Sequence, residues 1–534
     1  MAKSVKKKIP SKSIKSQEKV TDINPSIDKY FWLIIPILTA IYFISSKYSV
    51  GFYQDDEIAQ YLNMLQFWND PWVILGNMPK PGYKIFMVIP ALFGYDVVLT
   101  VNSFIASLTV FFTYKLIKAY KLNYAFVGAL LLAFQPLFFD LSFRSYSEIF
   151  TALLVVIFLM LYENKQYIWS ALVCGYIFTV RQEIGIVLVI LAIIFIRKKE
   201  FVPALLLFVF PAIYNLLGLI HTGDFMYVLT EMQKVAGLNY KSQGFLHYFK
   251  VYIFIVGPVS LVLFLSGFFG FLNKINDNKE YFSQYLLLYV MFISVFGVQL
   301  MTMFNDGPNP GNWRYLLHIS PVCAVFAVIG LHNLSNKNFR ITFLALTGGL
   351  ALLTIAFLSY TTDGFTLNEE KEYSKFLFIL VLMVTAILLW SDSKTKYLNN
   401  MSVLVIILAI VYLFLNFEPK KLSAENIKIK EAAEFVDNNY NIDGKQVLSN
   451  HAFFQFYSEQ YKDNITSYKP IQQATLLEAP PGSIIVWETH YGYRPEWGND
   501  VNIEVLANDS ASYKLVNQIL WDPRGAGAYI FEKK

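Results

Sequence analysis

The sequence predicts an α-helical polytopic membrane protein with about thirteen transmembrane helices and a small extracytoplasmic C-terminal α/β domain. Three observations lead to this prediction. The 534-residue chain is 55% hydrophobic and 17% aromatic. Only 16% of its residues are charged, whereas soluble domains carry roughly 25%. Apolar runs long enough to cross a bilayer recur along the first 416 residues, and the composition changes after them.

The apolar runs give the order of the candidate spans. They cover roughly residues 31–46, 97–117, 122–140, 146–162, 166–181, 184–196, 201–220, 251–272, 282–303, 315–333, 340–359, 374–390 and 400–416. A basic tail, residues 1–30, precedes the first run, and its first twenty positions hold seven lysines and one glutamate. No small-residue cleavage site follows the first run, so we interpret it as an uncleaved span and the tail as cytoplasmic.

The charges between the spans predict the orientation. Lysines and arginines gather in six alternate connections, at Lys115/Lys118/Lys121, Lys165, Arg197/Lys198/Lys199, Lys274/Lys279, Lys337/Arg340 and Lys394/Lys396. The other connections carry most of the acids and the isolated arginines, from Asp55 to Asp363. The positive-inside rule then puts the N-terminus in the cytoplasm, and an odd number of spans puts the C-terminal region outside.

The same composition limits the partners. Beyond the basic tail the net charge is close to zero, which does not indicate a nucleic-acid partner. Both cysteines, Cys174 and Cys323, fall within predicted spans, so no disulfide framework is expected. With no sorting signal apparent, we expect a multi-pass protein of a bacterial inner membrane.

Residues 417–534 alternate helix and strand signals. The segment SAENIKIKEAAEFVDNNY predicts a helix opened by Ser423, while KQVLSN, SIIVWETH and GAGAYIFEKK predict strands. This pattern is typical of a small α/β domain. His451, Glu488 and His490 lie near the predicted strands, but their spacing matches no metal-ligand pattern, so we interpret them as strand-edge polar residues.

Three consecutive acids open the first outer loop, residues 47–96. Asp55, Asp56 and Glu57 precede an amphipathic segment in GFYQDDEIAQYLNMLQFW, which predicts an interfacial helix anchored by Trp68. One interpretation is that Asp55 or Asp56 caps this helix. Because adjacent helical residues diverge by about 100°, at most two of the three acids can face one substrate.

Further ionisable residues lie at the outer ends of other spans. They are Arg144 and Glu148 in LSFRSYSEIF, expected on one helix face, Arg181 and Glu183 in VRQEIG, and Arg314, Tyr315 and His318 in NPGNWRYLLHISP. Each charge at membrane depth costs about 2.5–3.5 kcal/mol on insertion scales, so such residues are usually functional or paired. An interhelical ion pair is the alternative for each arginine taken singly.

Sugar transfer from a polyprenyl phosphate requires this set of groups. The leaving lipid phosphate needs cationic donors as its charge develops, and the acceptor hydroxyl needs a carboxylate to take its proton. No P-loop, HExxH or serine-elbow motif is present to indicate another chemistry.

The chain resembles the GT-C glycosyltransferases, polytopic enzymes that use polyprenyl-phosphate sugars. DDEIAQYLNMLQFW resembles the first outer loop of the protein mannosyltransferase and aminoarabinose-transferase branches, FRSYSEIFTALL resembles dolichyl-phosphate-mannose mannosyltransferases, and NWRYLLHISP resembles bacterial members. The resemblance covers the architecture of residues 1–416. No histidine follows the acidic pair and no proline precedes it, so the branch and the sugar stay open.

The resemblance implies roles for individual residues. Asp56 matches the catalytic carboxylate, acting as general base, with Asp55 as the alternative. Candidate contacts to the donor phosphate are Arg144, Arg181 and Arg314, supported by Glu57, Glu148, Glu183, Tyr315 and His318. The partner is a lipid-linked sugar donor, the acceptor is an exported lipid, glycan or protein, and no resident metal or other cofactor is expected.

Two other hypotheses fit the composition. A transporter or flippase would use the same charges to line a pathway, although such folds often show internal repeats and charges at span centres. A non-catalytic assembly protein would use the charges as ion pairs. In that case, Asp56→Asn would leave its function intact.

Overall fold

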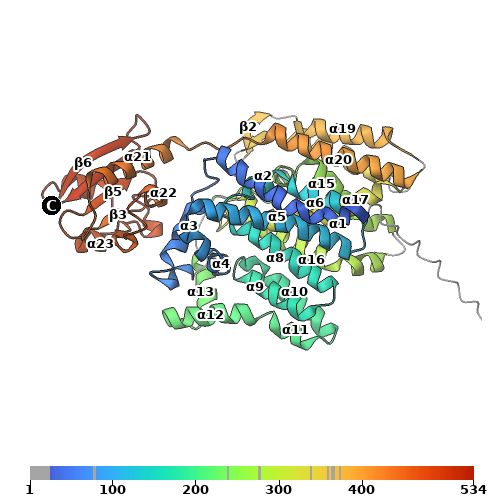
Figure 1. The fold of residues 1–534 in the computed structure, drawn as a ribbon, viewed down its shortest axis with the longest axis horizontal. Coiled ribbons are helices and arrows are strands. Elements are labelled where there is room, and N and C mark those ends of the chain that lie inside the picture. The colour runs from blue at the N-terminus through green and yellow to red at the C-terminus, as the bar shows by residue number, and fades with distance from the viewer. Residues whose placement is uncertain are drawn as a thin grey trace, which may run out of the picture.

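The computed structural model describes residues 25–534, apart from residues 76–79, 237–239, 275–277, 337–339, 358–359, 363–366, 372–373 and 392. Most of the predicted basic tail, together with Lys337 and Asp363 of the charge pattern, lies outside these described residues. Figure 1 shows a large helical region and, at one end of it, a separate small domain that contains the C-terminus.

Twenty α-helices precede residue 417 in the described chain. They are α1 (Pro25–Tyr30), α2 (Ile34–Tyr48), α3 (Asp56–Gln66), α4 (Pro81–Leu92), α5 (Tyr95–Ala119), α6 (Ala125–Ala133), α7 (Pro136–Leu141), α8 (Ser147–Glu163), α9 (Tyr167–Phe178), α10 (Gly185–Arg197), α11 (Phe201–Leu206), α12 (Val209–Thr222), α13 (Tyr227–Ala236), α14 (His247–Val256), α15 (Pro258–Phe268), α16 (Asn278–Thr302), α17 (Ser320–Leu334), α18 (Arg340–Phe357), α19 (Ser374–Leu388) and α20 (Lys394–Asn416). A short antiparallel pair, β1 (Tyr360–Thr362) and β2 (Leu367–Lys371), lies between α18 and α19.

Six helical stretches among the described residues are long and apolar enough to cross a membrane. They are Asp28–Tyr48, Tyr95–Ala119, Phe201–Thr222, Lys279–Thr302, Trp313–Leu334 and Lys394–Asn416. A seventh span is possible if α14 and the helix after it, bent by 115°, count as one. Four shorter apolar helices accompany them. The structure therefore confirms a multi-pass helical membrane protein, but not the predicted count of thirteen spans.

Helices α15 and α17 approach each other closely in the core. A Cβ atom on Gly267 would lie 1.9 Å from the carbonyl oxygen of Phe326, and one on Gly330 would lie 1.9 Å from that of Leu263. Only glycine permits the two backbones to meet at this distance, as is common where membrane helices pack. This pair fixes α17, whose preceding turn carries Arg314.

The predicted amphipathic helix is present as α3, but it is not a free interfacial helix. Its apolar face is buried, and the ring of Tyr61 packs edge-on against Phe456 of the C-terminal domain at 5.9 Å. The expected capping by an acid is wrong. Asp55 stands at the N-cap position in a helical conformation, and its side chain makes no cap hydrogen bond.

The C-terminal domain contains the predicted helix and strands. Its elements are α21 (Ala424–Asn439), β3 (Val447–Ser449), α22 (Ala452–Tyr457), β4 (Tyr468–Lys469), α23 (Gln473–Glu478), β5 (Ile484–Glu488), α24 (Ile503–Asn508), β6 (Tyr513–Leu520) and β7 (Gly527–Lys533). Ser423 caps α21 by accepting the backbone N–H of Asn426, as expected. The sheet order is β4-β3-β5-β7-β6, with β4, β3 and β5 parallel and the last two strands antiparallel to their neighbours.

The domain is held against the first outer loop by its linker. The N–H of Gly51 donates to the carbonyl of Lys420 at 2.8 Å, and a Cβ on Gly51 would lie 2.1 Å from the carbonyl oxygen of Lys421. The ring of Phe52 then packs on Phe453 at 4.6 Å. These contacts place the acidic stretch between the helical region and the C-terminal domain.

Candidate active site

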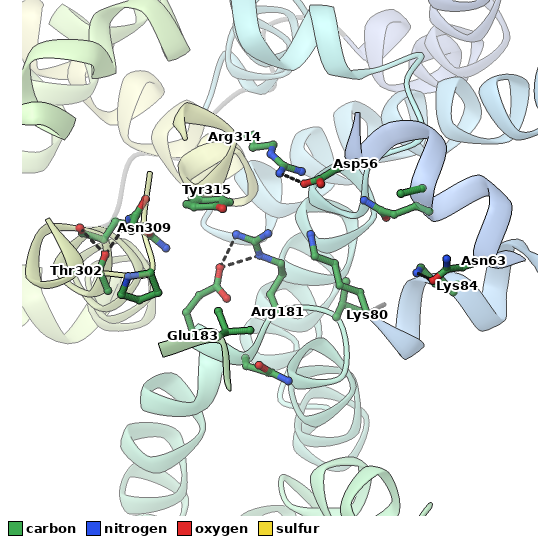
Figure 2. Close-up of a pocket in the computed structure, with 17 residues that line it drawn as sticks. Asp56, Asn63, Lys80, Lys84, Arg181, Glu183, Thr302, Asn309, Arg314 and Tyr315 are labelled. Carbon is green, nitrogen blue, oxygen red and sulfur yellow. Dashed lines mark hydrogen bonds and ion pairs between the residues drawn. The ribbon is translucent and has the colours of Figure 1, made fainter. Parts of the chain in front are cut away.

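A cavity of about 290 Å³ opens beside the N-terminal end of α3. Its charged lining consists of Asp56, Lys80, Lys84, Arg181, Glu183 and Arg314. Figure 2 shows Asp56 and Lys80 on one side, with Arg181, Arg314 and Tyr315 beside them. Four basic side chains and two acidic ones therefore share the lining, which favours an anionic ligand.

Asp56 and Arg314 form the ion pair at the mouth of this cavity. One Nη2–H of Arg314 donates to Oδ2 of Asp56. Burial alone would raise the pKa of Asp56, but the nearby Arg314 guanidinium and Lys80 ammonium lower it below its ordinary value. Asp56 is therefore ionised at neutral pH and, unlike its partner, retains side-chain exposure of 36%.

The Arg314 guanidinium has hydrogen-bonding capacity left over. Its Nε and Nη1 atoms are buried and make no hydrogen bond within the described chain, although Nη1 lies 3.6 Å from a Glu148 oxygen. Its plane stacks 4.8 Å from the ring of Tyr146 and 5.6 Å from that of Tyr315. A buried guanidinium with unused donors is suited to bind a phosphate oxygen.

Glu148 neutralises the cations from behind the cavity. It is fully buried, and its Oε1 lies 2.9 Å from Nη1 of Arg181 and 3.7 Å from Nζ of Lys80. Arg181 in turn contacts Glu183 at 2.7 Å and stacks 5.1 Å from Tyr315. The ion pair between Arg181 and Glu148 of α8 agrees with the interhelical alternative that we gave for each arginine, yet Arg181 also lines the cavity.

Lys80 and Lys84 are functional candidates that the sequence analysis missed. Lys80 has a left-handed backbone (φ 53°) just before α4, and burial lowers its pKa to about 8 while Glu148 acts in the opposite direction. Lys84 is buried and donates to Oδ1 of Asn63 at 2.9 Å. The segment PKPGYK places two lysines on a predicted outer loop, against the positive-inside pattern. This exception could have marked them as functional candidates.

The remaining wall of the cavity is uncharged and combines polar side chains with apolar ones, among them Val180, Val235 and Pro308. Asn309 donates to Oε1 of Gln299 at 2.9 Å and to Oγ1 of Thr302 at 2.8 Å. Figure 2 shows Asn309 and Thr302 across the cavity from Asp56. Amides and hydroxyls of this kind suit the hydroxyl groups of a sugar.

Arg144 and Glu57 lie outside the cavity lining and form a separate, closed ion cluster. Arg144 contacts Glu57 at 3.4 Å and Asp140 at 3.3 Å, and it donates to the carbonyl of Gly51 at 2.8 Å. Glu57 also accepts the hydroxyl of Tyr95 at 2.6 Å. This cluster ties the first outer loop to the turn between α7 and α8.

The prediction that Arg144 and Glu148 lie on one helix face is wrong. Helix α8 begins only at Ser147, so Arg144 lies in the preceding turn and Glu148 in the first helical turn. The two side chains consequently face different partners, Glu57 for Arg144 and Arg181 for Glu148.

Asp55 and His318 are also apart from the cavity lining. The carboxylate of Asp55 accepts the hydroxyl of Tyr491, which belongs to the C-terminal domain. His318 is fully buried at the end of the 3₁₀ turn Trp313–Ile319 that also carries Arg314 and Tyr315. Neither ring nitrogen of His318 makes a hydrogen bond within the described chain.

Comparison with solved structures identifies the fold. The crystal structure of ArnT from Cupriavidus metallidurans bound to undecaprenyl phosphate matches with a TM-score of 0.55 at 11% identity, over 94% of this chain and 98% of that one. The apo structure of the same protein matches with a TM-score of 0.59 at 10% identity, over the same shares. ArnT is a GT-C aminoarabinose transferase. The resemblance to GT-C enzymes is thus confirmed at the level of the fold.

The sequence comparisons add no closer relationship. No protein-family model matches the chain. No curated protein matches it either.

Proposed function

We propose that the protein is a membrane glycosyltransferase that moves a sugar from a polyprenyl-phosphate donor to an exported lipid, glycan or protein. The observation that carries the proposal is the buried, cation-rich cavity beside Asp56, within a GT-C fold. Undecaprenyl phosphate is bound in the ArnT structure with which this chain shares its fold, and that supports a lipid phosphate here.

The charge of the cavity suits the donor. A sugar phosphodiester carries one negative charge, and the lipid phosphate that leaves carries up to about two. Arg314, Arg181 and Lys80 supply fixed positive charge where this second charge develops. Stabilisation that grows along the reaction lowers the barrier, because it is stronger in the transition state than in the ground state.

Asp56 is the proposed general base. It takes the proton of the acceptor hydroxyl as the acceptor oxygen bonds to the anomeric carbon and the bond from that carbon to the phosphate oxygen breaks. The cations that lower the pKa of Asp56 also make it a weak base. A bound anionic phosphate beside Arg314 and Lys80 offsets those cations, so the donor itself strengthens the base.

Arg181 and Arg314 are the proposed phosphate contacts, with Lys80 added to them. Arg144 was a third candidate from the sequence. Its contacts with Glu57 and Asp140 support instead a role in holding the first outer loop. Asp55 contacts Tyr491, which supports a positioning role and favours Asp56 as the base. The orientation follows the charge pattern, with the cavity at the extracytoplasmic face.

The test uses a null strain carrying either the wild-type chain or Asp56→Asn at equal expression. Surface glycans and glycolipids are compared by mass spectrometry. We expect one defined sugar to be present with the wild type and absent with Asp56→Asn, and the missing mass then identifies the sugar. Identical glycans in both strains, differing from the null, would rule out Asp56 as the base. Identical glycans in all three strains would favour a transporter or assembly role.

A further inference from the structure

Three metal-ligating side chains meet in the C-terminal domain, far apart in sequence. Glu425 lies in the first turn of α21, His451 follows β3, and His490 follows β5. Oε1 of Glu425 is 3.1 Å from Nε2 of His451 and 2.8 Å from Nδ1 of His490. One ligand atom from each residue lies within 4.8 Å of the others.

The sheet topology places this cluster where α/β domains bind ligands. β3 and β5 are adjacent and parallel, with Leu448 paired to Ile485. From β3 the chain crosses to β4 on one side, and from β4 it returns to β5 on the other, so their carboxyl ends form a topological switch point. Crevices at such points are the usual ligand sites of open parallel sheets. His451 and His490 are the residues that the two strands deliver there.

The donor set fits a divalent transition metal. Two imidazoles and a carboxylate form a three-ligand zinc site, with a fourth position open to water. Tetrahedral zinc at about 2.1 Å from each ligand spaces the ligand atoms about 3.4 Å apart. The two distances to Glu425, 3.1 and 2.8 Å, are shorter than this, and the two imidazole nitrogens lie within 4.8 Å of each other, so small side-chain rotations would complete the geometry. The side chains of His490 and Glu425 are 40% and 26% exposed, which leaves an entry path.

Glu488 stabilises the cluster through hydrogen bonds to the backbone of the loop after β5. Its carboxylate is fully buried and accepts the backbone N–H groups of His490 at 2.6 Å and Tyr491 at 2.8 Å. These bonds fix the loop that carries His490, as the outer-shell partners of metal ligands do. Together with Glu425, Glu488 brings two negative carboxylates to the cluster, which balances the charge of a divalent ion beside neutral imidazoles.

Without a metal, the cluster is joined by hydrogen bonds. Nδ1 of His451 accepts the N–H of Phe453 at 3.3 Å, at the start of α22, so Nε2 carries the proton and donates it to Glu425. A metal at Nε2 must displace this proton and weaken the contact with Phe453. Binding is consequently opposed by acid and by the α22 cap. This competition also separates the two roles of His451 experimentally.

We propose that Glu425, His451 and His490 bind one zinc-like divalent cation. The ion would join α21 to the loops after β3 and β5. Tyr491 stacks on His490 at 4.0 Å, and its hydroxyl contacts Asp55 immediately before α3. The ion therefore braces the loop that holds the C-terminal domain against the acidic stretch. The site lies outside the cavity, and its existence does not depend on the proposed transferase activity.

The test measures zinc binding by the full-length protein, purified in detergent after removal of any affinity tag. The protein is stripped with chelator, dialysed, reloaded with Zn²⁺ and assayed by inductively coupled plasma mass spectrometry and by its melting temperature. We expect about one zinc per wild-type chain and a higher melting temperature with zinc. Co²⁺ in place of zinc should give the visible absorption of a tetrahedral site.

Matched variants locate the ion. His451→Asn keeps an oxygen that can accept the N–H of Phe453 but loses the metal ligand, and Glu425→Gln keeps the size of the side chain. Each should lose the bound zinc and the thermal shift. His490→Gln, at a partly exposed position, tests the same claim if His451→Asn fails to fold. His221→Asn is the control, because His221 stacks on Trp72 in the helical region, and it should keep the zinc.

The zinc content of the wild type and the variants decides whether the site exists. Loss of zinc in the three cluster variants and retention in His221→Asn supports the site. Absence of zinc from the reloaded wild type, or equal zinc in wild type and variants, overturns it. Neither result bears on the transferase proposal, because no readout uses sugar transfer.

Discussion

Two neighbouring acids, Asp56 and Glu57, enter two ion clusters of opposite character. Glu57 is buried and enclosed by Arg144, Tyr95 and the backbone of Tyr53. Asp56 is partly exposed at a cavity where its partner Arg314 retains unused hydrogen-bonding capacity. A closed cluster fixes a loop, whereas an open one with surplus positive charge is available to a ligand. The presence of an ion pair therefore does not by itself distinguish a structural charge from a functional one in a membrane protein.

Removal of the Asp56 carboxylate should give the largest effect on activity. Asp56→Asn keeps the size of the side chain but cannot accept the acceptor's proton. We expect the turnover of sugar transfer to fall by about 10²–10⁴-fold, as is typical for loss of a general base. The measurement is transfer by purified wild type and variant at equal amounts, with the melting temperature as the control for folding. A loss below about tenfold would place the base elsewhere.

Removal of the Glu57 carboxylate, in the closed cluster, should affect stability instead. Glu57→Gln leaves Arg144 with Asp140 as its remaining acidic partner, and breaking a buried pair costs about 3–5 kcal/mol. We expect a lower melting temperature in detergent, with the turnover of the folded fraction retained. The double variant Glu57→Gln/Arg144→Gln should recover part of this loss, because the buried Arg144 charge is removed with its partner and Asp140 still has Lys420 at 3.9 Å. An undiminished melting temperature in Glu57→Gln would show that the cluster does not hold the loop.

Lys80 tests the electrostatic role of the open cluster. Lys80→Asn removes the charge while tolerating the left-handed backbone. We expect the KM for the donor to rise about tenfold, equivalent to one charged contact of about 1.4 kcal/mol.

The pH dependence provides a second readout for the same residue. The pKa of Lys80 is lowered to about 8, so the ammonium is present below that pH and lost above it. Anionic donor binding should therefore weaken as the pH rises through about 8 in the wild type. In Lys80→Asn the KM should be flat across this range. An identical rise in both proteins would assign the titration to another group.

The contact of Asp55 with the C-terminal domain should give the smallest effect. Tyr491→Phe removes one hydroxyl that donates to Asp55. A single hydrogen bond contributes about 0.5–1.5 kcal/mol, so we expect kcat/KM to fall by up to about tenfold. The measurement is the same transfer assay. A loss as large as that of Asp56→Asn would make Asp55 the base and Tyr491 its essential partner.

The sequence predicted the ingredients of the site better than their arrangement. The 3.6-residue periodicity predicted α3, and the acids and arginines at span ends indicated the charged region. The periodicity alone could not show which of the three acids faces the cavity, because helical neighbours diverge by about 100° and their partners come from distant segments. Arg144 and Glu148 were wrongly placed on one helix face because the helical spacing was extended to Arg144, which lies before both the predicted span and α8.

Other residues were missed for different reasons. Lys80 and Lys84 lie in a short segment without a recognisable motif, and tertiary structure brings them to the cavity. Glu425 is 26 residues from His451 and 65 from His490, so no local spacing relates them. The fold of the parallel strands places these side chains together. Long-range convergence of this kind is visible only in three dimensions.

Two double variants of equal charge test most directly whether the open cluster binds the lipid phosphate. Asp56→Asn/Arg314→Gln removes the ion pair at the cavity. Glu57→Gln/Arg144→Gln removes the ion pair of the closed cluster. Each variant therefore loses one acid and one arginine. Binding of undecaprenyl phosphate to the purified proteins is measured by native mass spectrometry. We predict that the first variant loses at least about tenfold in affinity, the value of one charged contact, while the second stays near the wild type. Equal losses in both variants, or none in either, would contradict the assignment of the open cluster to the lipid phosphate.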